Sequence, residues 1–164
     1  QSLVQQPVVT ANQIQPDEGF PSGTETILVA EDNDTVRILT RNLLQENGYR
    51  VIEARHGDDA LQRFMENADE IRLLLLDVLM PKKNGWGVYE MICKIRPGIK
   101  VIFMSGYTAD VFDKRLIPEQ GVPLMGKPIP PGDLLRALRR ELDPIGQDHR
   151  CGQNPEERIF MHTA

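Results

Sequence analysis

The sequence predicts an α/β fold in which helices cover both faces of a parallel β-sheet. Two observations support this class: short apolar runs alternate along the chain with helical repeats, and each run leads into a polar group. The run at 73–76 consists of four leucines, which is typical of a strand buried on both faces. Alternation of this kind implies parallel strands joined by right-handed crossovers.

Five strands are predicted from these runs. Four apolar strands are expected at 27–30, 73–76, 101–104 and 122–126, and a short, more polar strand at 50–54. The apolar strands lead, in chain order, into Glu31 and Asp32, Asp77, Ser105 and Lys127. Because parallel strands place their carboxyl ends at one edge of a sheet, we expect these polar groups to meet at that edge.

Helices are predicted between the strands from apolar residues spaced three and four apart. The first should be capped by Asp34 and should end at Gly48. Its apolar face is formed by Val36, Leu39, Leu43 and Leu44. Further helices are expected from about 58, from 85 to just before Pro97, at about 109–117, and around 134–142.

Composition limits the domain organisation and the partners. Of the 164 residues, 40% are hydrophobic, which is enough for one core. We expect a domain at 24–143, a linker or disordered segment at 1–23 and a polar tail at 144–164. The net charge of −5 and the lack of a basic block argue against direct nucleic-acid binding. Without a membrane-length apolar run or a signal-peptide pattern, no membrane contact and a cytoplasmic location are expected.

At the polar groups the sequence resembles the receiver domain of two-component response regulators. The resemblance covers about residues 25–143. It rests on Glu31-Asp32, the Asp-Val-Leu-Met-Pro segment at 77–81, Gly85, Ser105-Gly106 and Lys127-Pro128. Each fragment is weak alone, but all except Gly85 come at the end of a predicted strand, and those four in this order form a strong signal. The resemblance implies a flavodoxin-like, doubly wound fold with strand order 2-1-3-4-5.

The resemblance also implies roles for individual residues. Asp77 would be the phosphoacceptor, with Lys127 and Ser105 contacting phosphoryl oxygens. Mg²⁺ would be bound by Glu31, Asp32, Asp77 and the backbone carbonyl of Leu79. The chemistry agrees, because a carboxylate that attacks a phosphoryl group needs a cation to screen both charges, and Mg²⁺ prefers oxygen ligands. The domain would catalyse its own phosphorylation and dephosphorylation, with a histidine kinase or histidine phosphotransfer domain as donor.

One position departs from the family pattern. The residue three before the lysine is usually aromatic and changes position on activation, whereas this chain has Leu124. We therefore expect the signal to pass through the loop at 105–109, with Tyr107 as the nearest aromatic residue. The resemblance also admits a homodimer through the face formed by the fourth helix, the fifth strand and the fifth helix.

Several related and unrelated functions compete. The linker before Thr24 and the Met-Ser-Gly-Tyr segment at 104–107 favour a receiver that follows the kinase core of a hybrid sensor histidine kinase; the alternative is a stand-alone single-domain regulator. A haloacid-dehalogenase-like phosphohydrolase would need a second aspartate at the position of Leu79. A flavodoxin-like cofactor binder would place phosphate beside Glu31 and Asp32, which would repel it.

Overall fold

A computed structural model describes residues 19–106 and 121–143. The strands are β1 (Thr26–Ala30), β2 (Arg50–Ala54), β3 (Ile71–Asp77), β4 (Lys100–Ser105) and β5 (Leu124–Gly126). The helices in this part of the chain are α1 (Asp34–Glu46), α2 (Gly57–Glu66), α3 (Gly85–Ile95) and α4 (Pro131–Leu142). The helix expected at about 109–117 lies outside the described residues. Within the described ranges, no helix is both long and apolar enough to cross a membrane.

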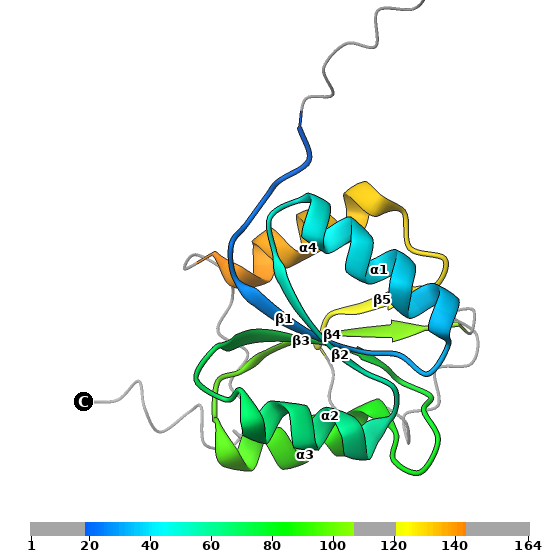
Figure 1. Ribbon diagram of the computed structural model, residues 1–164, viewed down its shortest axis with the longest axis vertical. Helices are drawn as coiled ribbons and strands as arrows, with labels where there is room; N and C mark the ends of the chain where they lie inside the picture. Colours follow the sequence, from blue (N-terminus) through cyan, green and yellow to red (C-terminus); the bar gives the residue numbers. More distant parts are fainter. Residues whose placement is uncertain (1–18, 107–120, 144–164) are drawn as a thin grey trace, which may run out of the picture.

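The five strands form one parallel sheet in the order β2-β1-β3-β4-β5. This order confirms the doubly wound, flavodoxin-like fold that the sequence predicts. Figure 1 shows α1 and α4 on one face of the sheet and α2 and α3 on the other. Strand β3 lies in the middle, between β1 and β4, so its carboxyl end has a strand on each side.

The leucine run of β3 is buried on both faces, as its composition predicts. Leu73 and Leu75 belong to the core on the α1 and α4 face, and Leu74 and Leu76 to the core on the α2 and α3 face. All four side chains are fully buried. Successive strand residues point to opposite faces, so an uninterrupted apolar run is needed where helices cover both.

The start of α1 differs from the sequence prediction by one residue. Asn33, and not Asp34, is the N-cap: its side-chain oxygen accepts the Val36 N–H at 3.0 Å. Asn33 has the extended backbone that an N-cap requires, whereas Asp34 is already helical and its carboxylate contacts Arg37 at 2.5 Å. At the other end, Gly48 follows the helix with φ of +93°, which agrees with its predicted role as a terminator.

The starts of β5 and α2 also differ from the sequence prediction. Strand β5 begins at Leu124, later than the expected residue 122. Pro123 has no N–H to donate, although its carbonyl accepts the Phe103 N–H at 2.9 Å. Helix α2 begins at Gly57 and is capped by His56, whose Nδ1 accepts the Asp59 N–H at 3.1 Å.

Candidate functional site

The carboxyl edge of the sheet brings together the polar groups at the carboxyl ends of β1, β3 and β5. Ala30 pairs with Leu76 across β1 and β3, so Glu31 and Asp77 come next on neighbouring strands. One carboxylate oxygen from each of Glu31, Asp32 and Asp77 lies within 4.8 Å of the other two. The edge predicted from the sequence is therefore a real cluster of three acidic side chains.

Lys127 joins this cluster from the end of β5. Its Nζ donates to Oε2 of Glu31 at 2.9 Å and to Oδ2 of Asp77 at 3.2 Å. The Glu31 and Asp77 side chains are only 1% and 5% exposed, and that of Lys127 is 20% exposed. One ammonium group is therefore shared between two buried carboxylates.

Sharing one cation leaves the buried carboxylates incompletely compensated. Burial and the neighbouring charge of Glu31 raise the pKa of Asp77 to about 7, and Lys127 offsets only part of this effect. Burial by itself would lower the pKa of Lys127, but its bond to Glu31 and the charge of Asp77 raise that pKa overall. The site thus holds a protonated lysine and favours the addition of positive charge near Asp77.

Glu31 is held firmly at this edge. Its N–H donates to the Ala54 carbonyl at 3.1 Å, and its own carbonyl accepts from Nη1 of Arg37 at 2.9 Å. Its Oε1 accepts the Asn33 N–H at 3.0 Å, while Oε2 binds Lys127. In contrast, the neighbouring side chain of Asp32 is exposed. The arrangement presents one fixed and one solvent-facing carboxylate beside Asp77.

The loop after β3 explains why Gly85 belongs to the sequence pattern. The Gly85 N–H donates to the Val78 carbonyl at 2.9 Å, which turns the chain back toward the end of β3. A Cβ at this position would collide with the carbonyl oxygen of Asp77. Any other residue here would therefore displace the backbone of Asp77.

The remaining predicted residues lie around this centre. Ser105 ends β4, and its carbonyl accepts the Lys127 N–H at 2.6 Å. Leu79 lies two residues beyond Asp77, with a side chain that is 39% exposed. Leu124 is partly buried against the core on the α2 and α3 face. Tyr107 lies outside the described residues.

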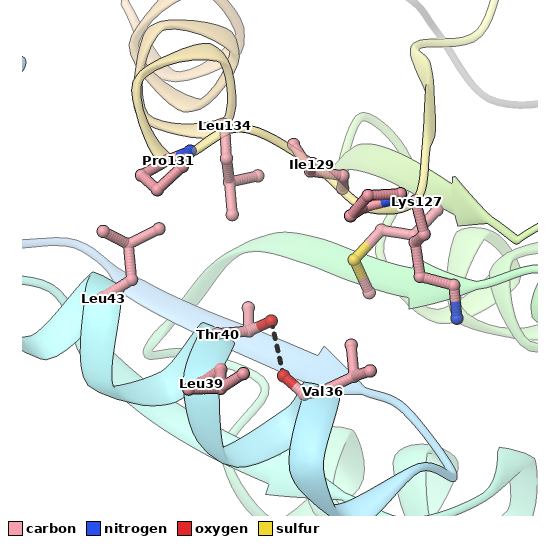
Figure 2. A pocket seen from close by; sticks show the side chains of 10 residues that line it. Val36, Leu39, Thr40, Leu43, Lys127, Ile129, Pro131 and Leu134 are labelled. Carbon is pink, nitrogen blue, oxygen red and sulfur yellow. Dashed lines mark hydrogen bonds between the residues drawn. The ribbon is translucent and has the colours of Figure 1, made fainter.

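An apolar groove of about 600 Å³ runs beside the site, between α1 and the start of α4. Figure 2 shows Leu39 and Leu43 of α1 facing Ile129 and Leu134, with Lys127 at one end. Leu39, expected on the apolar face of α1, is 63% exposed. The sequence signal for the groove was that the predicted apolar face of α1 includes a residue, Leu39, that the core does not bury.

Arg37 is the residue near the site that the sequence prediction missed. It lies on α1 and is 5% exposed, although arginine is rarely buried without partners. Its spacing, six residues after Glu31, carries no recognisable motif. Only the fold shows that its guanidinium reaches the carbonyl of Glu31.

Comparison with known proteins identifies relatives of this chain. A family model described as the response regulator receiver domain matches residues 27–139. The sensor kinase CckA of Brucella abortus is 34% identical over 122 residues, which are 74% of this chain and 13% of that kinase. The response regulator receiver protein CpdR of Brucella abortus is 28% identical over 116 residues, which are 71% of this chain and 95% of CpdR.

Solved structures show the same fold. The receiver domain of the hybrid histidine kinase CckA is 35% identical, with a TM-score of 0.61, covering 71% of this chain and 98% of that one. A response regulator receiver domain protein from Clostridium thermocellum is 29% identical, with a TM-score of 0.65, covering 72% of this chain and 94% of that one. Each match covers more than two thirds of this chain and nearly all of the solved receiver-domain structure.

Proposed function

Because the chain belongs to the response regulator receiver domain family of two-component signalling, we propose that Asp77 accepts a phosphoryl group from a phosphohistidine. The observation that carries this assignment is the position of Asp77, buried beside Glu31 and Lys127 at the end of the central strand. An oxygen of Asp77 would attack phosphorus as the phosphorus–nitrogen bond to the donor breaks. The imidazole nitrogen keeps that electron pair and takes up a proton.

The acidic cluster fits a divalent cation, which we take to be Mg²⁺. Glu31, Asp32 and Asp77 offer carboxylate oxygens within 4.8 Å of one another, and oxygen donors are what Mg²⁺ prefers. The raised pKa of Asp77 points the same way, because it reflects negative charge that a cation would offset. The carbonyl of Leu79 is a further proposed ligand. When bound, Mg²⁺ would screen the like charges of carboxylate and phosphoryl group.

Lys127 and Ser105 have distinct proposed roles around the phosphoryl group. Lys127, which now bridges Glu31 and Asp77, would pair with a phosphoryl oxygen and keep it oriented. The Ser105 hydroxyl would donate to another oxygen and draw the following loop inward. Leu124 packs on the core and has no polar tip, so we propose that the switch depends on Ser105 and on Tyr107.

Mass measurement on the intact chain tests the phosphoacceptor. Incubation with acetyl phosphate and Mg²⁺ should add the mass of one phosphoryl group, and hydroxylamine should remove it. Asp77→Asn should abolish the addition, whereas Asp133→Asn, which alters an exposed carboxylate of α4, should leave it intact. An Asp77→Asn protein that still gains the mass would rule out this assignment.

The relatives favour a receiver within a longer protein. The sensor kinase CckA matches this chain over only 13% of its own length, which is the pattern of a receiver attached to a kinase. We therefore propose the receiver of a hybrid sensor histidine kinase, with the domain at 24–143 between a linker and a tail. The alternative is a stand-alone regulator, because the match to CpdR covers 95% of that protein.

The groove beside Lys127 is the surface that we assign to the phosphodonor. A donor histidine must reach Asp77, and the groove begins at the site and is lined by apolar residues of α1 and of the segment after β5. An amphipathic helix of a histidine kinase or phosphotransfer domain fits such a groove. Helix docking there would bring a phosphohistidine on that helix toward the carboxyl edge of the sheet.

A charge placed in the groove tests this docking surface. Leu39→Glu should slow transfer from an autophosphorylated histidine kinase core, chosen from a panel as the fastest donor, and should leave phosphorylation by acetyl phosphate unchanged. Met65→Glu is the matched control, because Met65 is 61% exposed on α2, across the sheet, against 63% for Leu39. Equal slowing by both variants, or by neither, would contradict the assignment.

A further inference from the structure

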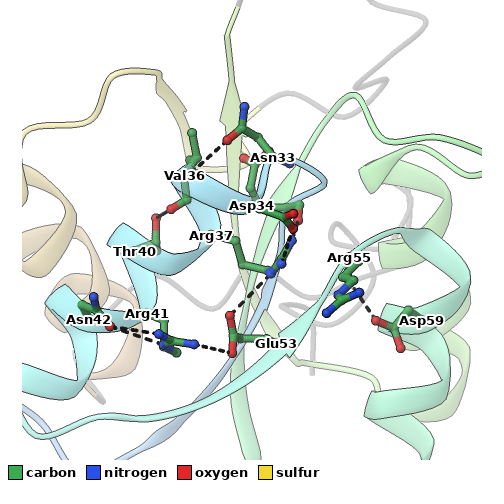
Figure 3. A network of polar contacts seen from close by, with 11 residues as sticks. Asn33, Asp34, Val36, Arg37, Thr40, Arg41, Asn42, Glu53, Arg55 and Asp59 are labelled. Carbon is green, nitrogen blue, oxygen red and sulfur yellow. Dashed lines mark hydrogen bonds and ion pairs between the residues drawn. The ribbon is translucent and has the colours of Figure 1, made fainter.

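Arg37 is an arginine buried directly beneath the loop that carries the acidic residues. Its side chain is 6% exposed. Figure 3 shows it extending from α1 between the start of that helix and β2. The guanidinium donates to the Glu31 carbonyl at 2.9 Å, contacts Asp34 at 2.5 Å, and lies 3.4 Å from Oε1 of Glu53. Three groups from different segments therefore converge on one side chain.

The bond to Glu31 acts on the backbone and not on the carboxylate. The N–H and both carboxylate oxygens of Glu31 are bonded to Ala54, Asn33 and Lys127. With the Arg37 bond to its carbonyl, every polar group of Glu31 has a hydrogen-bond partner. The chain reverses direction immediately afterwards, between the end of β1 and the start of α1. The orientation of that carbonyl therefore helps to set where the next carboxylate, that of Asp32, points.

The charge of Arg37 is compensated away from the acidic cluster. Asp34 contacts one terminal nitrogen, and Glu53 of β2 lies beside the Nε. Glu53 also accepts from Arg41 at 3.1 Å, which ties the network to the next turn of α1. The guanidinium can therefore support the loop while leaving the negative potential at Glu31, Asp32 and Asp77 available to a cation.

We propose that Arg37 is a positioning residue for the divalent cation: it fixes the turn that aims Glu31 and Asp32 at a common point with Asp77, and Glu53 anchors it. The inference rests on the proposed function, because it assumes a metal at the acidic cluster. A lysine could not replace it, since a single ammonium cannot reach the carbonyl and both flanking carboxylates in the directions that the forked guanidinium serves.

Mg²⁺ titration of backbone amide resonances tests this role. Arg37→Met and Arg37→Lys should each weaken Mg²⁺ binding by about tenfold or more, as loss of a group that orients metal ligands does. Arg41→Met is the matched control, because Arg41 shares Glu53 but does not touch the loop. It should change the affinity by less than about threefold, as expected for a partly exposed ion pair.

A second readout needs no metal. The Asn33 amide donates to Glu31 Oε1, so its resonance reports the geometry of the turn. It should shift in metal-free Arg37→Met and Arg37→Lys and stay in place in Arg41→Met. All titrations are made at a temperature where circular dichroism shows each variant fully folded, so that reduced stability alone cannot lower the affinity. The lysine variant keeps a cation under the loop and serves if the methionine variant does not fold.

The possible outcomes separate this inference from the proposed function. Wild-type affinity in a folded Arg37 variant, with the Asn33 resonance unmoved, would overturn the positioning role and leave the metal site standing. Equal weakening in the Arg41→Met control would also overturn it, because the effect would then belong to the ion-pair network in general. If Asp32→Ala binds Mg²⁺ as tightly as wild type, the metal site itself falls, and this inference falls with it.

Discussion

Two clusters of charged side chains lie at opposite edges of the sheet, and they are built from the same kinds of groups. At the carboxyl edge, Lys127 is shared between Glu31 and Asp77. At the amino edge, Arg139 of α4 grips both oxygens of Glu25, the residue before β1, at 2.8 and 3.0 Å. In the first cluster one ammonium group is shared between two buried carboxylates, whereas in the second the guanidinium binds both oxygens of Glu25 and a further, exposed carboxylate.

The pKa values record this difference. The bond to Arg139 lowers the pKa of Glu25, whereas burial and Glu31 raise the pKa of Asp77 to about 7. Arg139 also donates to the exposed carboxylate of Asp143 at 2.8 Å and to Tyr49 Oη at 3.3 Å. At the amino edge the charged groups are fully paired, whereas at the carboxyl edge the buried carboxylates keep an unfavourable charge that the proposed cation would offset.

The largest expected change in stability comes from breaking the Arg139 network at the amino edge of the sheet. Arg139→Met should lower the free energy of unfolding by about 2 kcal/mol, because it leaves Glu25 without its charge-assisted bonds and removes those to Tyr49 and Asp143. Urea unfolding measures the change, and Arg140→Met, the next residue of α4 and exposed, should have little effect. Mg²⁺ affinity should stay at the wild-type value. Unchanged stability in Arg139→Met would mean that this network does not support the fold.

At the carboxyl edge, removing a charged side chain should increase the stability of the fold. The folded pKa of Asp77, about 7, lies above its ordinary value of 3.8, so the folded state holds a proton more tightly than the unfolded state. Stability without metal should therefore fall as the pH rises from about 4 to about 7. Asp77→Asn should remove this slope and raise stability above pH 7 by roughly 1 to 2 kcal/mol, because the amide avoids the buried charge but also loses the attraction to Lys127. Thermal unfolding across this pH range, with Asp133→Asn as control, tests the comparison; the same slope in both variants would contradict it.

Mg²⁺ should stabilise the fold through the carboxyl edge and not through the amino edge. Metal binding requires ionised carboxylates, so the rise in melting temperature that Mg²⁺ produces should be larger at about pH 8 than at about pH 6. Asp32→Ala should reduce that rise at both pH values, and Glu25→Gln, at the other edge, should not. An equal rise in wild type and Asp32→Ala would show that the metal binds away from the acidic cluster.

The smallest expected effect concerns the segment before β1. Gly23 donates its N–H to the Asn47 carbonyl at 3.1 Å, and Phe20 lies against Gly132 of α4. A chain that begins at residue 24 should still fold and take up phosphate, but should be less stable than one that begins at 19 by about 1 kcal/mol or less. Chemical unfolding of the two shortened chains measures this difference. Loss of phosphate uptake on removing 19–23 would show that this segment supports the site.

The sequence by itself determined the sheet and the edge where the polar groups gather. Four leucines in β3 can be buried only between two helical layers, and the polar residues after each strand then meet because parallel strands end together. Glu31, Asp77 and Lys127 were therefore predictable as neighbours. The helix boundaries were less predictable. Whether Asn33 or Asp34 caps α1, for example, depends on one residue of backbone register.

Only the tertiary structure decided how the charges are divided. The sequence shows three acidic residues and a lysine, but whether Lys127 binds one carboxylate or two depends on distances between strands far apart in the chain. The same holds for Arg37, whose proposed role depends on its ion pair with Glu53 of β2, sixteen residues away in the chain. Apolar patterning is local and periodic, so a sequence displays it; a pKa or a buried ion pair depends on desolvation and geometry, which exist only once the chain is folded.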